Sequence, residues 1–109
     1  MTETLKVLGQ SQPGATSLTD AYTVPALTQA SVSSIVVCNT DNAAHSFRVS
    51  VAVGGAADDP SQYLYYDCPI VANDTFVSTI GVSLGPADVV RVYSDAGDLA
   101  FTIFGVEVT

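Results

Sequence analysis

Apolar and polar residues alternate along most of this chain, beginning near residue 31. In the segment 47–53, Phe47, Val49 and Val51 alternate with Arg48 and Ser50. Successive side chains of a strand point to opposite faces, so this period of two predicts a β-strand with one buried face. No segment shows the sustained spacing of apolar residues that marks an amphipathic helix. We therefore expect an all-β protein with very little helix.

Strand-like segments recur through the sequence and are separated by turn-forming residues. They cover residues 5–8, 22–25, 32–38, 47–53, 63–68, 75–84, 89–93 and 99–104. Short strands with turn signals every 8–12 residues are typical of sandwiches and barrels. The pattern predicts an antiparallel β-sandwich of seven to eight short strands, of jelly-roll or immunoglobulin-like type.

Turn chemistry predicts how some of these strands are connected. The residues 39–42 and 95–98 are rich in Asn, Asp and Gly, which favour tight turns. We expect the first turn to join strands 32–38 and 47–53 in a hairpin, and the second to join 89–93 and 99–104. Pro69 cannot donate a hydrogen bond to a neighbouring strand, so it indicates that strand 63–68 lies at an edge or a bend.

The length of 109 residues fits a single domain. We expect residues 1–20 to form an N-terminal arm or edge strand and residues 21–109 to form one β-sandwich domain. Hydrophobic residues make up 48% of the chain, but no run of them is long enough to span a membrane. The first residues also lack the basic and apolar regions of a secretory signal. No membrane partner is expected.

The charge of the chain disfavours nucleic acid as a partner and favours contact with other proteins. The chain carries 3 Lys and Arg against 11 Asp and Glu, for a net charge of -8. Such a protein repels a phosphate backbone, so no nucleic-acid partner is expected. Only 13% of the residues are charged, about half of the usual share. A surface with so few charges favours coverage by neighbouring molecules.

Residues that could carry chemistry are sparse. His45 is the only histidine, and its neighbour Ser46 would point to the opposite face of the strand, so the two do not form a base and a nucleophile. We expect His45 to face solvent at the start of its strand. One His and two separated Cys do not make a zinc site. We therefore expect no enzyme, no catalytic residue, no cofactor and no metal ligand.

The loop carboxylates and the two thiols are expected to have structural roles. Asp58–Asp59 and the loop 95–98 are expected to form ordinary turns, with an adventitious divalent ion as the alternative. Cys38 and Cys68 are expected to be free buried thiols. A disulfide between them is the alternative, and it would require an oxidising compartment or an extracellular particle.

The segment 63–68 contains a cluster of tyrosines. Tyr63 and Tyr65 are expected to share one face of the strand, opposite Leu64 and Tyr66. Tyrosine combines an apolar ring with a polar tip, so an outward pair could contact a protein or a carbohydrate. Packing in the core or along the edge is the alternative.

Several strand and turn segments, taken together, resemble a family of small structural proteins encoded by tailed bacteriophages. They are residues 22–25, 36–39, 47–49, 65–67, 73–76, 88–93 and 104–107. The resemblance extends from about Leu8 to Thr109. It implies a virion component, attached to the surface of the head, neck or tail.

These observations lead to one expected function and one alternative. We expect a non-enzymatic capsid decoration, or cement, protein that is located in the virion after assembly in the host cytoplasm. Its partners would be copies of itself, with a homotrimer as the hypothesis, and other virion proteins such as the major capsid protein. The expected contact residues are Leu5 and Val7 in the N-terminal arm and Tyr63, Tyr65 and Tyr66. The alternative is a module associated with the neck or tail fibres that binds a host surface glycan.

Overall fold

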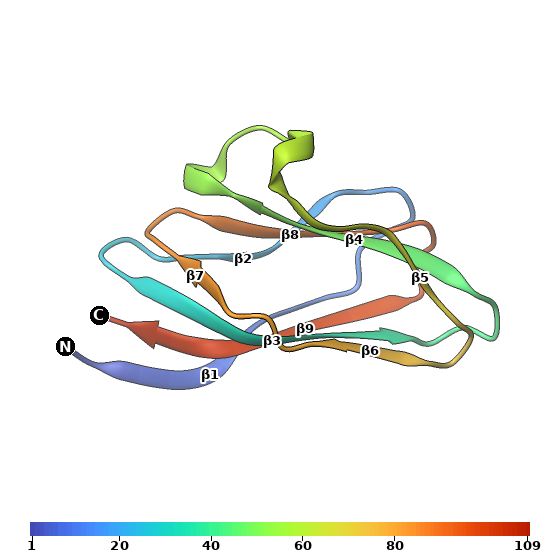
Figure 1. Ribbon diagram of the computed structural model, residues 1–109, viewed down its shortest axis with the longest axis horizontal. Coiled ribbons are helices and arrows are strands. Elements are labelled where there is room, and N and C mark those ends of the chain that lie inside the picture. Colours follow the sequence, from blue (N-terminus) through green and yellow to red (C-terminus); the bar gives the residue numbers. More distant parts are fainter.

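Two antiparallel sheets pack face to face in the computed structural model, which describes all residues from 1 to 109 (Figure 1). This arrangement confirms the expected all-β sandwich. In chain order the elements are β1 (Glu3–Ser11), β2 (Thr19–Thr23), β3 (Gln29–Asn39), β4 (His45–Ala52), η1 (Val53–Gly55), η2 (Pro60–Gln62), β5 (Tyr63–Ile70), β6 (Thr75–Ser78), β7 (Val82–Leu84), β8 (Val89–Ser94) and β9 (Leu99–Val108).

The strand order is that of a jelly roll. The first sheet runs β1-β9-β3-β6, with β7 also paired to β3, and the second sheet runs β2-β8-β4-β5. Strands from the first half of the chain pair antiparallel with strands from the second half: β1 with β9, β2 with β8, β3 with β6 and β7, and β4 with β5. The chain is thus one long hairpin rolled into two sheets, which distinguishes it from the immunoglobulin-like alternative.

Both predictions of a hairpin, made from turn chemistry, are wrong. The strands β3 and β4 lie in different sheets, and so do β8 and β9. The connections between them are arches that cross from one sheet to the other. Turn-forming residues specify that the chain reverses, but the packing of the two apolar sheet faces decides whether the next strand pairs or crosses.

Nine strands are present instead of seven or eight. The additional strand arises because the segment 75–84 divides into β6 and β7, with Gly81 in the interval between them. The prediction for Pro69 is confirmed, since β5 is an edge strand of the second sheet. The loop after β4 contains two short 3-10 turns, η1 and η2, and lies over the outer side of the second sheet (Figure 1).

The core lies between the sheets and is built from the inward positions of the alternating strands. Phe47 of β4 is completely buried, and its ring centroid lies 5.1 Å from that of Phe76 and 6.1 Å from that of Phe101. These rings come from both sheets, so they join the two layers. Leu99 and Ile103 of β9 are also completely buried.

The residues 1–20, expected as an arm or an edge strand, contain β1, which is the edge strand of the first sheet. Its pairing with β9 extends to both ends of the chain, because Thr2 and Thr109 exchange hydrogen bonds of 2.8 and 2.9 Å. Leu8 of β1 is buried in the core. No helix of this chain combines the length and the apolar character needed to cross a membrane.

The two cysteines are free thiols, as expected. Cys38 belongs to β3 of the first sheet and Cys68 to β5 of the second, and both side chains are half-buried. They are therefore less buried than the sequence predicted. A disulfide between them is not formed.

Candidate functional site

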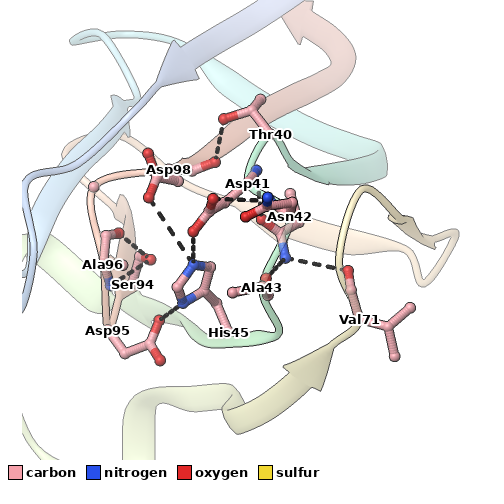
Figure 2. A network of polar contacts seen from close by, with 12 residues as sticks. Thr40, Asp41, Asn42, Ala43, His45, Val71, Ser94, Asp95, Ala96 and Asp98 are labelled. Atoms are coloured by element: carbon pink, nitrogen blue, oxygen red, sulfur yellow. Dashed lines mark hydrogen bonds and ion pairs between the residues drawn. The ribbon is translucent and has the colours of Figure 1, made fainter.

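His45 lies at the centre of a polar cluster at one end of the sandwich (Figure 2). Only 14% of its side chain is exposed, so the expectation that it faces solvent is wrong. Its Nε2 lies 2.8 Å from Oδ2 of Asp41 and 3.9 Å from Oδ2 of Asp98, and its Nδ1 lies 3.3 Å from Oδ1 of Asp95. Both ring nitrogens thus face carboxylates.

The two arches bring these carboxylates together. Asp41 belongs to the β3–β4 arch, whereas Asp95 and Asp98 belong to the β8–β9 arch. Main-chain contacts join the arches, since Thr40 donates hydrogen bonds of 3.0 Å from its N–H and 2.7 Å from its hydroxyl to the carbonyl oxygen of Asp98. A local hairpin at either position would have separated these residues.

A buried asparagine shapes the β3–β4 arch. Asn39 is 1% exposed and donates through Nδ2 to the carbonyl oxygens of Ala43, at 2.9 Å, and Val71, at 3.1 Å. Its Oδ1 accepts a hydrogen bond of 3.0 Å from the N–H of Asp41. Both N–H groups and the oxygen of this side chain are used, so Asn39 sets the position from which Asp41 reaches His45.

The β8–β9 arch is held in a similar way. The buried Ser94 accepts a hydrogen bond of 3.1 Å from the N–H of Ala96 and donates to the carbonyl oxygen of the same residue. The N–H of Asp95 donates a hydrogen bond of 3.2 Å to the carbonyl oxygen of Ser46, the residue that follows His45. The carboxylates of Asp95 and Asp98 therefore extend from an anchored main chain.

The electrostatics of the cluster favour a cation. The hydrogen bond to Asp41 raises the pKa of His45, and the negative charges of Asp95 and Asp41 raise it further. The same hydrogen bond lowers the pKa of Asp41, with a contribution from the N–H of Asn42. No hydrogen bond of the His45 ring involves a hydroxyl or thiol that could act as a nucleophile. The arrangement of three carboxylates around one imidazole suits the binding of a cation.

The tyrosines of β5 are arranged differently from the expectation. Irregularities in the pairing of β5 with β4 shift the register twice, and Asp67 adopts a left-handed backbone conformation with φ of 50°. Each such bulge reverses the side-chain alternation. As a result Tyr63 contacts Tyr66, with ring centroids 5.0 Å apart, while Tyr65 packs toward the core against Phe76 at 5.2 Å.

Tyr63 and Tyr66 line a pocket on the outer side of the second sheet. Its volume is about 460 Å³, and its other lining residues are Arg48, Asp58 and Pro60. The guanidinium of Arg48 is stacked between two rings, 4.1 Å from the centroid of Tyr66 and 4.4 Å from that of Tyr93. Oδ1 of Asp58 accepts a hydrogen bond of 2.9 Å from the Tyr63 hydroxyl. The pocket combines aromatic faces with a fixed cation and a carboxylate.

Several apolar side chains lie on the outer side of the first sheet, next to polar ones such as Ser34 and Thr102. Pairing places Leu5 opposite Val106, Val7 opposite Phe104, and Val36 opposite Val77, so these side chains share one face. We call these six residues the apolar face. Leu5 is 86% exposed, and Val7, Val77 and Phe104 are also exposed. Lys6, which alternates with Leu5 and Val7, pairs instead with Glu107 at 3.2 Å on the other side of the sheet.

No protein-family model matches the chain, and no curated protein matches it in sequence. The expected contact residues fall on two separate surfaces: Leu5 and Val7 on the apolar face, and Tyr63 and Tyr66 in the pocket. Tyr65 joins neither. The cluster around His45 was not predicted from the sequence. Its only local signal is the aspartates in the turns 39–42 and 95–98, which supply the carboxylates.

Proposed function

We propose that this chain is a non-enzymatic structural protein of a tailed-bacteriophage virion, and that it decorates the capsid by docking its apolar face on the shell. The observation that carries the proposal is the apolar face itself. Leu5, Val7 and Phe104 are all exposed on this face, and an exposed apolar patch of this kind often marks an interaction surface. The resemblance to small phage structural proteins supports the location.

The jelly roll is compatible with this role, because the architecture is common in viral capsid and lectin domains. Fold alone does not establish function, and it is the exposed apolar face that supports this role. On a capsid lattice, many copies contact the shell and one another, and repeated weak contacts add up to firm attachment. The proposed partners are the major capsid protein and further copies of this chain, with a homotrimer as the working hypothesis.

Charge introduced into the apolar face tests the proposal. We expect Val7→Asp and Phe104→Asp each to weaken binding to capsids assembled without the protein by at least about 10-fold, since an unpaired carboxylate is costly to bury. The matched control is Val53→Asp, because Val53 is 73% exposed in η1 on the other side of the molecule. Capsid binding by the two variants equal to that of the wild type would reject the proposal.

The pocket on the second sheet supports a second candidate function, recognition of a host surface glycan by a neck or tail component. Aromatic rings stack on the apolar faces of sugars, while Arg48 and Asp58 offer a donor and an acceptor for hydroxyl groups. A glycan-array screen distinguishes this candidate from decoration. Specific binding that is lost in Tyr66→Ala, but kept in the control Leu64→Ala on the same strand, would favour the glycan module.

A further inference from the structure

The cluster around His45 contains more negative charge than its own histidine can balance. Three carboxylates, those of Asp41, Asp95 and Asp98, lie within 4 Å of one imidazole ring. The three Lys and Arg residues of the chain are paired elsewhere: Lys6 with Glu107, Arg48 with Asp67, and Arg91 with Asp20. Even a protonated His45 leaves two negative charges without a basic partner.

We propose that His45, Asp41 and Asp98 form a binding site for one divalent transition-metal ion of the zinc type. The three ligands would be Nε2 of His45 and one carboxylate oxygen from each aspartate. This inference is independent of the proposed function, because it concerns the end of the sandwich and neither the apolar face nor the tyrosine pocket.

The geometry of the donor atoms fits such an ion. All three ligand atoms lie within 4.8 Å of one another. Ligands about 2.0–2.1 Å from a tetrahedral zinc ion are separated by about 3.3 Å. The distances from Nε2 of His45, 2.8 Å to Asp41 and 3.9 Å to Asp98, lie on either side of this value. Small rotations of the side chains suffice to surround an ion.

Asp95 supplies the outer contact that metal-binding histidines usually have. A ligating imidazole commonly donates its second N–H to a carboxylate, which fixes the tautomer and the orientation of the ring. Nδ1 of His45 lies 3.3 Å from Oδ1 of Asp95, so the Nδ1–H can remain on Asp95 while the metal ion replaces the proton through which Nε2 contacts Asp41 at 2.8 Å. Figure 2 shows the ring held between these two sets of carboxylates.

The donor set selects the class of metal. Imidazole suits zinc and its neighbours in the first transition row, whereas calcium and magnesium prefer oxygen ligands alone. Three protein ligands leave the fourth position of a tetrahedral ion open to water. The side chains of Asp41 and Asp98 are 34% and 48% exposed, so the ion can enter from solvent.

Metal binding would connect the two sheets. Asp41 lies in the β3–β4 arch, His45 begins β4, and Asp98 lies in the β8–β9 arch, so the ion joins both crossings at one end of the sandwich. An ion that binds the folded chain and not the unfolded one raises stability by mass action. A protonated His45 must release the Nε2 proton to bind the metal, so affinity falls as the pH is lowered.

Calorimetric titration of the full chain with ZnCl₂ at pH 7.5 tests the site. We expect one ion per chain and a rise in Tm. Asp98→Asn and His45→Asn should each weaken binding at least about 10-fold. The control is Asp74→Asn, since the exposed Asp74 is a loop carboxylate without a side-chain hydrogen bond. Absence of zinc binding, or equal binding by wild type and His45→Asn, would overturn the proposal.

Cobalt provides a second readout that does not depend on variants folding. Co²⁺ bound by nitrogen and oxygen ligands shows visible absorption without a thiolate charge-transfer band. We expect this spectrum, with displacement of Co²⁺ by Zn²⁺. A charge-transfer band would place the metal on Cys38 or Cys68 and would contradict the site at His45.

Discussion

The hydroxyl of Tyr22 donates a hydrogen bond of 2.6 Å to Oε2 of Glu107 and thereby joins the two sheets. Tyr22 lies in β2 of the second sheet and Glu107 in β9 of the first. Lys6 of β1 contacts the other carboxylate oxygen of Glu107 at 3.2 Å. Burial raises the pKa of Tyr22, and Glu107 raises it further through the hydrogen bond and its charge, so the phenol stays protonated.

Glu107→Gln should remove a pH-dependent part of the stability. The hydrogen bond from Tyr22, together with Lys6, lowers the pKa of Glu107 in the folded state below its ordinary value of 4.5. The ionised carboxylate therefore stabilises the fold above pH 4.5, and this contribution is lost as the pH falls through the lower folded-state pKa. In urea unfolding at pH 7, we expect the variant to be less stable by about 1 kcal/mol.

The difference between wild type and Glu107→Gln should shrink as the pH is lowered below 4.5. Glu3→Gln serves as the control, because the side chain of Glu3 is exposed at the end of β1. A difference in the free energy of unfolding that is the same at every pH would contradict this prediction.

Gly105→Ala should be strongly destabilising. A Cβ atom at this position would overlap the main-chain oxygen of Ser31 and lie 2.8 Å from Cδ1 of Leu8. Because the oxygen belongs to a paired strand, relief requires a shift of β3 or β9, and we expect a loss of about 3 kcal/mol. Gly81→Ala is the matched control, since its Cβ would have no atom within 4 Å. Chemical denaturation that ranks the two variants equally would contradict this explanation.

Phe47 should be among the most sensitive core positions. It is completely buried and contacts aromatic rings from both sheets. We expect Phe47→Ala to reduce the free energy of unfolding by about 3–5 kcal/mol, a large share of the total for a domain of this size. Phe47→Leu should cost less and still fold. A loss in Phe47→Ala no larger than that in Phe104→Ala, on the exposed face, would argue against this core.

The two thiols should be independent of each other. Cys38 and Cys68 are free and lie in different sheets. We expect a reducing agent to leave the Tm unchanged, and a thiol reagent to label two groups per unfolded chain without prior reduction. A Tm that falls on reduction would indicate a disulfide.

The positions of the strands could be predicted from local pattern. Alternation in the segment 47–53 corresponds to β4 (His45–Ala52), and the predicted segment 89–93 corresponds to β8 (Val89–Ser94). Alternation is readable because each strand buries one face, so its signal lies within a few residues. The edge position of β5 followed from Pro69 for an equally local reason.

The face of the tyrosines could not be predicted in the same way. Strict alternation places Tyr63 with Tyr65, whereas the bulges of β5 place Tyr63 with Tyr66. A bulge depends on how a strand fits its partner, and the partner is not visible in the local sequence.

The sequence by itself determined that this protein is an all-β sandwich, where its strands lie, and how little charge its surface carries. Only the tertiary structure decided which strands pair, because that choice depends on packing two apolar sheet faces together over the whole chain. The same choice turned two expected hairpin turns into arches and brought Asp41, Asp95 and Asp98 around His45. Each of these residues is unremarkable in the sequence, and their chemistry arises from the crossing of the sheets.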